Sequence, residues 1–226
     1  MILINPTNGI PSFQHAALNK TTDAGLQIRH SFFTAKGGVS SGVYTSLNCG
    51  LESGDEPNLI NENRRRASES LGFSTKEMFG LRQIHSADCV FIDATSNAEI
   101  NARAKADAMV TETANTALAI LTADCVPVLL AAPSSGLIGA IHAGWRGAVD
   151  GVLDATINTM IQRGAAPHDI IAVIGPAIQQ DHYQVGSDLH SIAVRHYPDA
   201  DLFFKPDLQK KYLFDLTGFI NWRLRA

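Results

Sequence analysis

The sequence predicts a single α/β domain, and three observations carry that prediction. Apolar runs at 117–121, 126–131 and 137–141 are short, rich in Val, Ile, Leu and Ala, and bounded by Pro, Gly, Ser or polar residues, as strands buried on both faces are. Residues 148–163 place apolar side chains at helical spacing, and Gly164 ends that pattern. Strand and helix patterns are mixed along one continuous chain without an internal repeat or a low-complexity linker, which favours one α/β domain.

The remaining elements follow in chain order. Residues 1–25 are expected to be irregular, and the glycine-rich loop at 36–42 lacks the Gly-Lys-Ser/Thr of a Walker loop. A helix opens at the acidic pair before Pro57 and is expected to run to Leu71, because Gly72 stops the pattern. Further strands are expected at 26–34, 78–84, 89–92, 107–111, 170–174 and 212–215, further helices at 188–196 and from 216 onward, and a surface loop at 94–106.

Composition excludes several classes of protein. The apolar share of 45% and charged share of 18% are those of a folded globular chain. A formal net charge of -4 gives no electrostatic reason to expect a nucleic-acid partner. The N-terminus carries no basic region followed by a long apolar one, and no run approaches the length of a membrane span. We therefore expect a cytoplasmic protein without nucleic-acid or membrane partners.

The cysteines point away from disulfides. There are three, Cys49, Cys89 and Cys125, with no CxxC pair, so neither a disulfide framework nor a zinc ribbon is indicated. Cys49 and Cys89 are expected to be small, buried apolar residues. Cys125 differs because it lies beside Asp124 at the end of a predicted buried strand, where polar groups must be paired, metal-bound or functional.

Three potential metal ligands lie at predicted strand ends. His85, Cys125 and His142 are separated by 40 and 17 residues, and two imidazoles with a thiolate can form a zinc site with an open fourth position. Two readings of the same residues stay open. Cys125 with either histidine is also the pair of a cysteine hydrolase, and the set can bind copper as an electron-transfer site. The eight histidines include no His-x-His, which argues against a multicopper oxidase.

Other polar residues have a functional and a structural interpretation. Asp124 is a general base, a partner of a ligand imidazole or a backbone cap. Arg146, just before a predicted helix, can bind an anion such as phosphate together with the helix N-terminus. Asn48, in the polar turn TSLNCG, is a ligand contact or a turn residue, and Arg64 lies on a helix whose cationic run can simply face solvent.

Several segments in order resemble one family. LRQIHSADCV, DAMVT, LTADCVPVLL, IHAGWRG and IGPAI, together with the glycine-rich loop, resemble the YfiH-like family, also described as polyphenol oxidoreductase or laccase-domain proteins. The resemblance extends from about His30 to Val185. It implies a single-domain sandwich of mixed β-sheets flanked by helices. It also implies a zinc site formed by His85, Cys125 and His142.

The resemblance further implies an activity and roles for single residues. Members of the family act as purine nucleoside phosphorylases on inosine, adenosine, guanosine and methylthioadenosine, and also deaminate adenosine. On that basis Arg146 and Arg64 are expected to hold phosphate, Asp124 to shuttle protons, and Asn48 and Gln83 to bond the sugar or base. The partners implied are purine nucleosides and phosphate, and the chain is expected to be a monomer or a weak homo-oligomer.

The sequence also departs from the family pattern. Lys36 stands where an arginine is expected, and Gln184 replaces the acid that often follows Tyr183. The chain ends at Ala226, so we expect one catalytic domain over 1–226 that lacks the last C-terminal segment of the family. A cysteine hydrolase of amide substrates and a non-catalytic metal-binding domain remain the alternatives.

Overall fold

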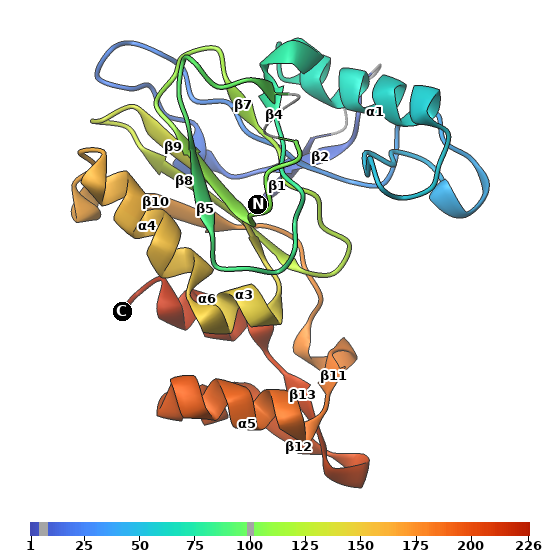
Figure 1. Ribbon diagram of the computed structural model, residues 1–226, viewed down its shortest axis with the longest axis vertical. Coiled ribbons are helices and arrows are strands. Elements are labelled where there is room, and N and C mark those ends of the chain that lie inside the picture. Colours follow the sequence, from blue (N-terminus) through green and yellow to red (C-terminus); the bar gives the residue numbers. More distant parts are fainter. Residues whose placement is uncertain (5–8, 99–101) are drawn as a thin grey trace.

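A mixed five-stranded sheet forms the centre of the molecule. The computed structural model describes residues 1–4, 9–98 and 102–226. The strand order is β10-β8-β9-β6-β5, with β5 and β6 parallel and the other neighbours antiparallel. The strands are β5 (Cys89–Ile92), β6 (Ala108–Thr111), β8 (Val126–Ala132), β9 (Leu137–Ala143) and β10 (Ile171–Ile174). An α/β fold is therefore confirmed (Figure 1).

The apolar runs predicted as buried strands include the two longest strands of this sheet. β8 and β9 form an antiparallel hairpin in which Val126 pairs with Ala143 and Ala132 with Leu137. All but one residue of each strand is buried, which confirms that both faces are covered. The run at 117–121 gives only the short strand β7 (Ala117–Leu118), because the backbone of Leu121 pairs with a side chain instead.

Two helices cover one face of the sheet where one was predicted. α3 (Trp145–Asp150) and α4 (Val152–Gln162) are separated by Gly151, whose φ of 98° lies in the left-handed region that glycine tolerates best. The prediction of one helix over 148–163 was therefore wrong at this glycine. α4 runs along the sheet in Figure 1, and its Leu153 and Met160 are buried in the main core.

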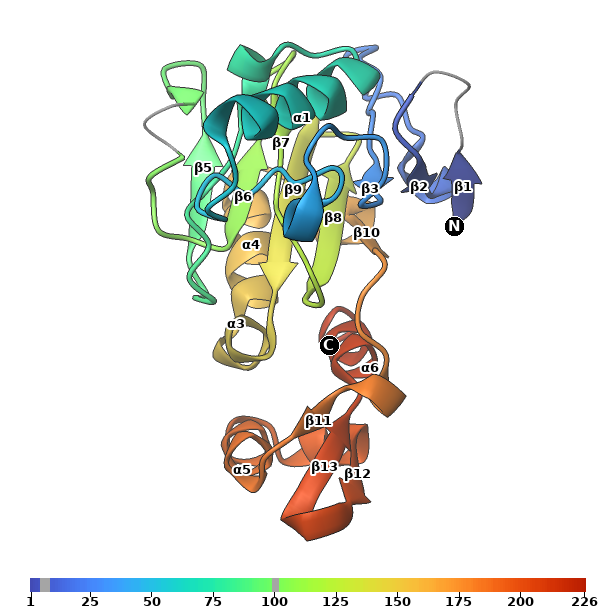
Figure 2. The same cartoon turned by 90° about the vertical axis from the view of Figure 1, so that its right-hand side faces the viewer.

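The opposite face carries α1 (Pro57–Ser70) and short strands. The helix confirms the predicted start at Pro57, and Gly72 follows with positive φ. Residues 1–25 were expected to be irregular, but this segment contains strands. A small antiparallel sheet joins β1 (Ile2–Ile4), β2 (Ser12–Gln14) and β3 (Phe32–Phe33), and β4 (Met78–Phe79) pairs in parallel with β7. Figure 2 shows the strands of the central sheet side by side from β5 to β10, with α1 on the near side.

Two predicted strands are shorter than expected for local reasons. The strand predicted at 26–34 is limited to β3, since Thr22 and Leu26 close a turn ahead of it. The strand predicted at 78–84 ends at Phe79, and His85 then has a φ of 61°, which is incompatible with a strand. Within the predicted loop 94–106, residues 99–101 lie outside the described residues, as do residues 5–8 of the N-terminal segment.

The C-terminal part forms a smaller unit. α5 (Ser187–His196) lies beside an antiparallel sheet of order β11-β13-β12, formed by β11 (Gln184–Val185), β12 (Phe204–Asp207) and β13 (Lys211–Phe214). This unit projects below the central sheet in Figures 1 and 2, and α6 (Leu216–Arg223) returns to the main core. β13 confirms the strand predicted at 212–215 to within a residue. β12 was missed because its Lys-Pro-Asp sequence is polar.

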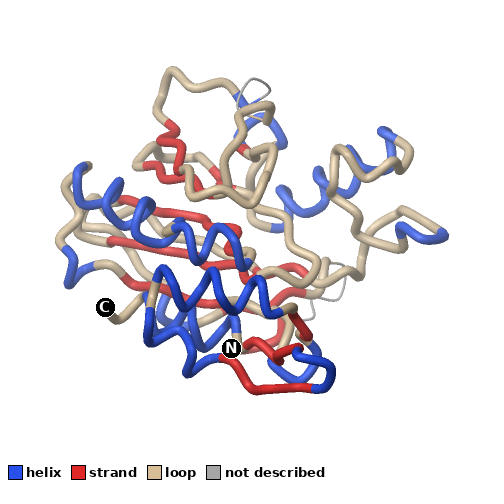
Figure 3. The backbone as a smooth tube through the Cα atoms, turned by 60° about the horizontal axis from the view of Figure 1, so that its bottom comes forward, coloured by secondary structure: helices blue, strands red, loops and turns tan. Residues whose placement is uncertain are grey.

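Loops make up much of the chain outside the central sheet (Figure 3). Across the described residues, every helix is too short or too polar to traverse a lipid bilayer.

Candidate metal centre

The β8–β9 hairpin brings Cys125 close to His142. Val126 pairs with Ala143 and Pro127 with His142, so Cys125 precedes β8 at the position opposite Gly144. Cys125 and Pro127 are two residues apart and therefore point to the same face, which is also the face of His142. Cys125 and His142, which are 17 residues apart in the sequence, are therefore diagonal neighbours across the hairpin.

Asp107 lies directly across from His142 on the neighbouring strand. The pairing of Ala108 with Ile141 puts Asp107 opposite His142, and the His142 amide donates to the Asp107 carbonyl at 2.8 Å. Their side chains also meet, with 2.8 Å between His142 Nδ1 and Asp107 Oδ1, and both residues are buried. Because Nδ1 is bonded to the carboxylate, Nε2 of His142 is left as the ring's metal-binding atom.

The same carboxylate fixes the backbone that carries His85. Oδ1 of Asp107 accepts a hydrogen bond from the His85 amide at 3.0 Å, and Oδ2 accepts from Ile84 at 3.1 Å and Ser86 at 2.6 Å. These bonds hold His85 at its left-handed φ of 61°. One buried aspartate therefore positions two of the three predicted ligands.

Asp107 was not among the site residues predicted from the sequence. A signal was present, because a lone carboxylate opens an otherwise apolar strand, and buried charges are almost always paired. The sequence does not show which strand pairs with this one, and therefore does not show that His142 is the partner of Asp107.

The three predicted ligands form a compact group. One ligand atom each from His85, Cys125 and His142 lies within 4.8 Å of the others. Cys125 Sγ is 3.7 Å from His85 Nε2. This distance is close to the separation of about 3.5 Å between a sulfur and a nitrogen ligand in a tetrahedral zinc site. His85 is exposed and His142 is buried, so the group is anchored on one side and open to solvent on the other.

Gly144 leaves the room that this group needs. A Cβ at this position would lie 2.4 Å from His85 Cδ2 and 3.2 Å from Cys125 Sγ. Any side chain would therefore displace a ligand. The donor set of two imidazoles and one thiolate suits zinc, with copper as the alternative. The residues present thus fit a metal ion.

Electrostatics couple His142 to Asp107. Burial disfavours the charged ring, but the hydrogen bonds to Asp107 and Cys125 and their negative charges more than offset it and raise the pKa of His142 to about 9. Burial likewise opposes ionisation of Asp107, yet bonds from His142 and three backbone amides lower its pKa to about 2. Without a metal the pair is a buried ion pair at neutral pH, and a metal ion would have to displace the proton on His142.

Asp124 and Tyr183 lie at the same end of the sheet. Asp124 is exposed, and its carbonyl accepts from the amide of Ile178 at 3.0 Å. Burial, together with the nearby negative charges of Cys125 and Asp124, raises the pKa of Tyr183 to about 12. The carboxylate bonded to a ligand imidazole is therefore that of Asp107 and not that of Asp124.

Gln83 and Asn48 use their amide groups within the protein. Nε2 of Gln83 donates to the Leu121 carbonyl at 2.7 Å, and its Oε1 accepts from the Leu121 amide at 2.8 Å. Asn48 Nδ2 donates to Ser53 Oγ at 2.8 Å and to Asp55 Oδ2 at 3.0 Å. Both side chains therefore stabilise the loops in which they lie.

The two predicted phosphate ligands differ in environment. Arg64 is half-buried on α1, and its Nη1 donates to the Cys49 carbonyl at 3.3 Å. Burial lowers the pKa of Arg64, and the charge of Cys49 partly opposes that effect. Arg146 is exposed in the first turn of α3, with its Cζ 5.2 Å from the Trp145 ring. Arg146 follows His142 by four residues, whereas Arg64 lies on α1, on the other side of the sheet.

Comparison with known proteins identifies relatives over most of the chain. A family model described as multi-copper polyphenol oxidoreductase laccase matches residues 29–226. A purine nucleoside phosphorylase of Deinococcus radiodurans is 42% identical over 164 residues, which is 73% of this chain and 62% of that protein. A purine nucleoside phosphorylase of Haemophilus influenzae is 37% identical over 86% of this chain and 78% of its own length.

Solved structures agree with these relatives. The crystal structure of the Bacillus licheniformis hypothetical protein YfiH is similar with a TM-score of 0.81 at 30% identity, covering 86% of this chain and 76% of that one. YlmD from Geobacillus stearothermophilus gives a TM-score of 0.78 at 32% identity, over 87% of this chain and 75% of that one.

Proposed function

The chain belongs to the multi-copper polyphenol oxidoreductase laccase family, which includes YfiH-like proteins, and on this premise we propose that it is a zinc-dependent purine nucleoside phosphorylase. The substrates we propose are inosine, adenosine, guanosine and methylthioadenosine, each cleaved by phosphate to a free base and a pentose 1-phosphate. Relatives named purine nucleoside phosphorylase support the reaction class.

One observation carries the metal-dependent part of the proposal. His85, Cys125 and His142 lie within 4.8 Å of one another, with Asp107 bonded to one ligand ring and to the backbone of the other. A carboxylate-histidine arrangement of this kind recurs in zinc proteins. The exposed side of the group leaves space for a substrate.

The residues around the group have distinct roles in the proposed reaction. Phosphate attacks the anomeric carbon while the bond to the purine breaks, so the site must hold an anion and stabilise a departing base. Arg146, which is exposed and four residues after His142, is assigned to the phosphate, and Arg64 is assigned to it secondarily. His85, Cys125 and His142 would hold the zinc ion, which would supply Lewis-acid chemistry. Asp107 keeps His85 and His142 in place.

Adenosine deamination is the second activity that we propose for this site. It requires a group that moves protons beside the reacting purine carbon. Asp124 is the candidate because it adjoins Cys125, is exposed, and is not the carboxylate bonded to His142. The sequence also predicts contacts from Asn48 and Gln83 to the sugar or base. Because both side chains already bond within the protein, the role we propose for them is to hold their loops.

Product analysis tests the proposal directly. Zinc-loaded protein is incubated with inosine and with adenosine, with and without phosphate, and the products are separated by chromatography. Hypoxanthine formed from inosine only when phosphate is present is the expected result. Inosine formed from adenosine without phosphate reports deamination. Cys125→Ala should abolish both reactions, whereas Cys89→Ala, at a half-buried cysteine of β5, serves as the matched control.

A cysteine hydrolase remains the alternative because Cys125 Sγ lies 3.7 Å from His85 Nε2. The two mechanisms respond differently to alkylation. A zinc-bound thiolate is shielded, so iodoacetamide should modify Cys125 only after a chelator has removed the metal. Inactivation of the metal-loaded protein, with amide hydrolysis in place of nucleoside cleavage, would favour the hydrolase. Metal analysis of the purified protein separates zinc from copper.

A further inference from the structure

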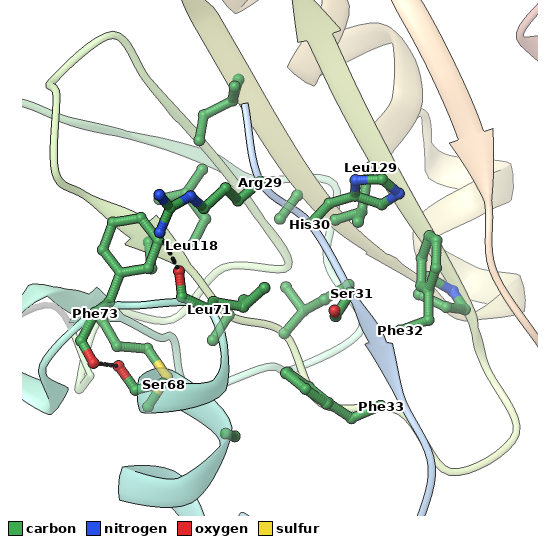
Figure 4. Close-up of a pocket in the computed structure, with 18 of the residues that line it drawn as sticks. Arg29, His30, Ser31, Phe32, Phe33, Ser68, Leu71, Phe73, Leu118 and Leu129 are labelled. Carbon is green, nitrogen blue, oxygen red and sulfur yellow. Dashed lines mark hydrogen bonds between the residues drawn. The ribbon is translucent and has the colours of Figure 1, made fainter. Parts of the chain in front are cut away.

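A large cavity lies on the face of the central sheet that carries α1. Its volume is about 910 Å³, and the surface of its wall is mostly apolar. Protein interiors are close-packed, with few voids larger than a water molecule, so a space of this size is suited to a small molecule. Figure 4 shows apolar side chains from several segments of its wall: Phe32 and Phe33 of β3, Leu71 and Phe73 after α1, Leu118 of β7 and Leu129 of β8.

The floor of the cavity leads along the β8–β9 hairpin to the candidate metal centre. Four residues of the hairpin line the cavity on this face: Ile138 and Ala140 of β9, and Leu129 and Pro127 of β8. The next residues on the same face are His142 and Cys125, because side chains two residues apart in a strand point to the same side. At about 3.4 Å per residue, His142 lies roughly 7 Å beyond Ala140. The cavity and the ligand group are therefore successive stretches of one face of the sheet.

The wall of the cavity confirms that it reaches the ligand group. It includes Thr122 and Ala123, which directly precede Asp124 and Cys125 in the chain. A substrate bound at the ligand group can therefore extend into the cavity without leaving the protein.

The order of these groups indicates which part of a nucleoside the cavity holds. In the proposed phosphorolysis the reacting carbon, C1′, has to lie at the ligand group, and C5′ is the sugar carbon most remote from it. The departing purine has polar edges that need hydrogen bonds, which a mostly apolar wall does not offer. A hydroxyl group on C5′ would likewise lose its hydrogen bonds to water, whereas a hydrocarbon substituent would gain by burial.

We propose that the cavity binds an apolar substituent on C5′ of a purine nucleoside, namely an alkylthio chain longer than methyl. The chain would lie against Leu129 and Ile138, which are half-buried and thus present apolar surface to the cavity. This inference rests on the proposed function, because it takes the reacting end of the nucleoside to lie at the ligand group.

Rates of phosphorolysis with three nucleosides test the proposal. They are adenosine, 5′-butylthio-5′-deoxyadenosine and 5′-(3-hydroxypropylthio)-5′-deoxyadenosine, in which a hydroxyl group replaces the last carbon of the chain. We expect kcat/KM to be at least about tenfold higher for the butylthio compound than for adenosine, because the chain is buried against apolar side chains. The hydroxyl-terminated chain should lose most of that gain. Equal kcat/KM for the butylthio compound and either of the other two would overturn the proposal.

Two variants locate the chain. Leu129→Trp fills the cavity, so the ratio of kcat/KM for the butylthio compound to that for adenosine should fall to within about twofold of one. Ile161→Trp, at an exposed residue of α4 outside the cavity, is the matched control and should leave the ratio unchanged. Should Leu129→Trp not fold, Leu118→Asn replaces it, because it places a polar group on the wall. An unchanged ratio in the folded Leu129→Trp or Leu118→Asn protein contradicts the proposal.

Failure of the proposed function gives a different result. Cleavage of all three nucleosides at similar rates would leave phosphorolysis intact and overturn only the role of the cavity. Cleavage of none would overturn phosphorolysis, and calorimetric titration with the same compounds would then test the cavity by binding alone. A Kd at least about tenfold lower for the butylthio compound than for adenosine would support the cavity assignment, and equal Kd values would overturn it.

Discussion

The sheet end that holds the ligand cluster and the loop between Lys36 and Asp55 use their polar side chains in opposite ways. At the sheet end the carboxylate of the buried Asp107 bonds to the His142 ring and to the backbone around His85. The Nε2 atoms of both histidines remain available to bind a metal ion. In the loop, Asn48 and Ser40 both bond to Asp55, and thus to the loop itself. Residue type alone does not distinguish a ligand-binding side chain from a loop-stabilising one. The hydrogen-bond partner of each side chain makes that distinction.

The largest effect is expected at the thiolate. Cys125→Ala removes one of three metal ligands, so the variant should lose its metal and more than about 100-fold of kcat/KM for phosphorolysis. Metal content by atomic spectroscopy and initial rates with inosine measure both. Full metal content with lost turnover would instead identify Cys125 as a nucleophile.

A side chain at position 144 should also weaken metal binding. Gly144→Ala places a carbon 2.4 Å from the His85 ring, which must move out of the ligand group. We expect zinc affinity to fall about 100-fold while the far-ultraviolet circular dichroism stays unchanged. Zinc affinity is measured by competition with a chromogenic chelator. Wild-type affinity in this variant would show that His85 is not a ligand.

Asp107→Asn should have the next largest effect. The amide keeps the size of the side chain but loses the charge that stabilises the His142 ring and one acceptor for the backbone of residues 84–86. Loss of such an orienting carboxylate typically costs about 10–100-fold in metal affinity. The Asp124→Asn variant serves as the control for charge alone, and it should retain metal binding while losing deaminase activity.

The same ion pair predicts a pH dependence for the metal-free protein. The folded-state pKa of His142 is raised to about 9, so its stabilisation is complete below the unfolded pKa near 6.5 and is lost as pH rises through 9. The shift corresponds to about 3 kcal/mol at most. Urea unfolding in a chelator at pH 6 and pH 9.5 measures it. Asp107→Asn should remove most of the difference, and a difference that persists in this variant would assign it to other groups.

The smallest effect is expected away from the cluster. Gln83→Ala removes two hydrogen bonds to the backbone of Leu121, which should cost about 1–2 kcal/mol of unfolding free energy and leave kcat/KM within about threefold. Asn48→Ala should behave in the same way. A large rise in KM without loss of stability would break the comparison, because it would show that these amides contact the nucleoside.

The parts predicted well from sequence are those with strong local signals. Apolar runs located β8 and β9, and Pro57 and Gly72 located α1, since burial and backbone preference act on residues close in the chain. The break at Gly151 was missed because one glycine in an apolar helical pattern does not show whether its φ is positive. β3 was overestimated because alternation does not reveal which residues pair.

The candidate site shows the same limit. His85, Cys125 and His142 were found from residue type at predicted strand ends, and the structure brings them together. Asp107 was not found, because its role depends on which strand lies beside β9. Gln83 and Asn48 were predicted as substrate contacts, but both bond within the protein. Gln83 bonds to Leu121, 38 residues away, and Asn48 bonds to Ser53 and Asp55, 5 and 7 residues away. Composition does not reveal these partners.

The turn of the β8–β9 hairpin is a position where we expect the chain to accept an insertion. Its turn, residues 133–136, lies at the end of the strands opposite Cys125 and His142, and Gly136 has open space around it. A guest domain inserted between Ser135 and Gly136 would preserve the strand pairing that sets the ligand geometry. The hairpin therefore offers an insertion point for a fluorescent reporter that leaves the far end of both strands undisturbed.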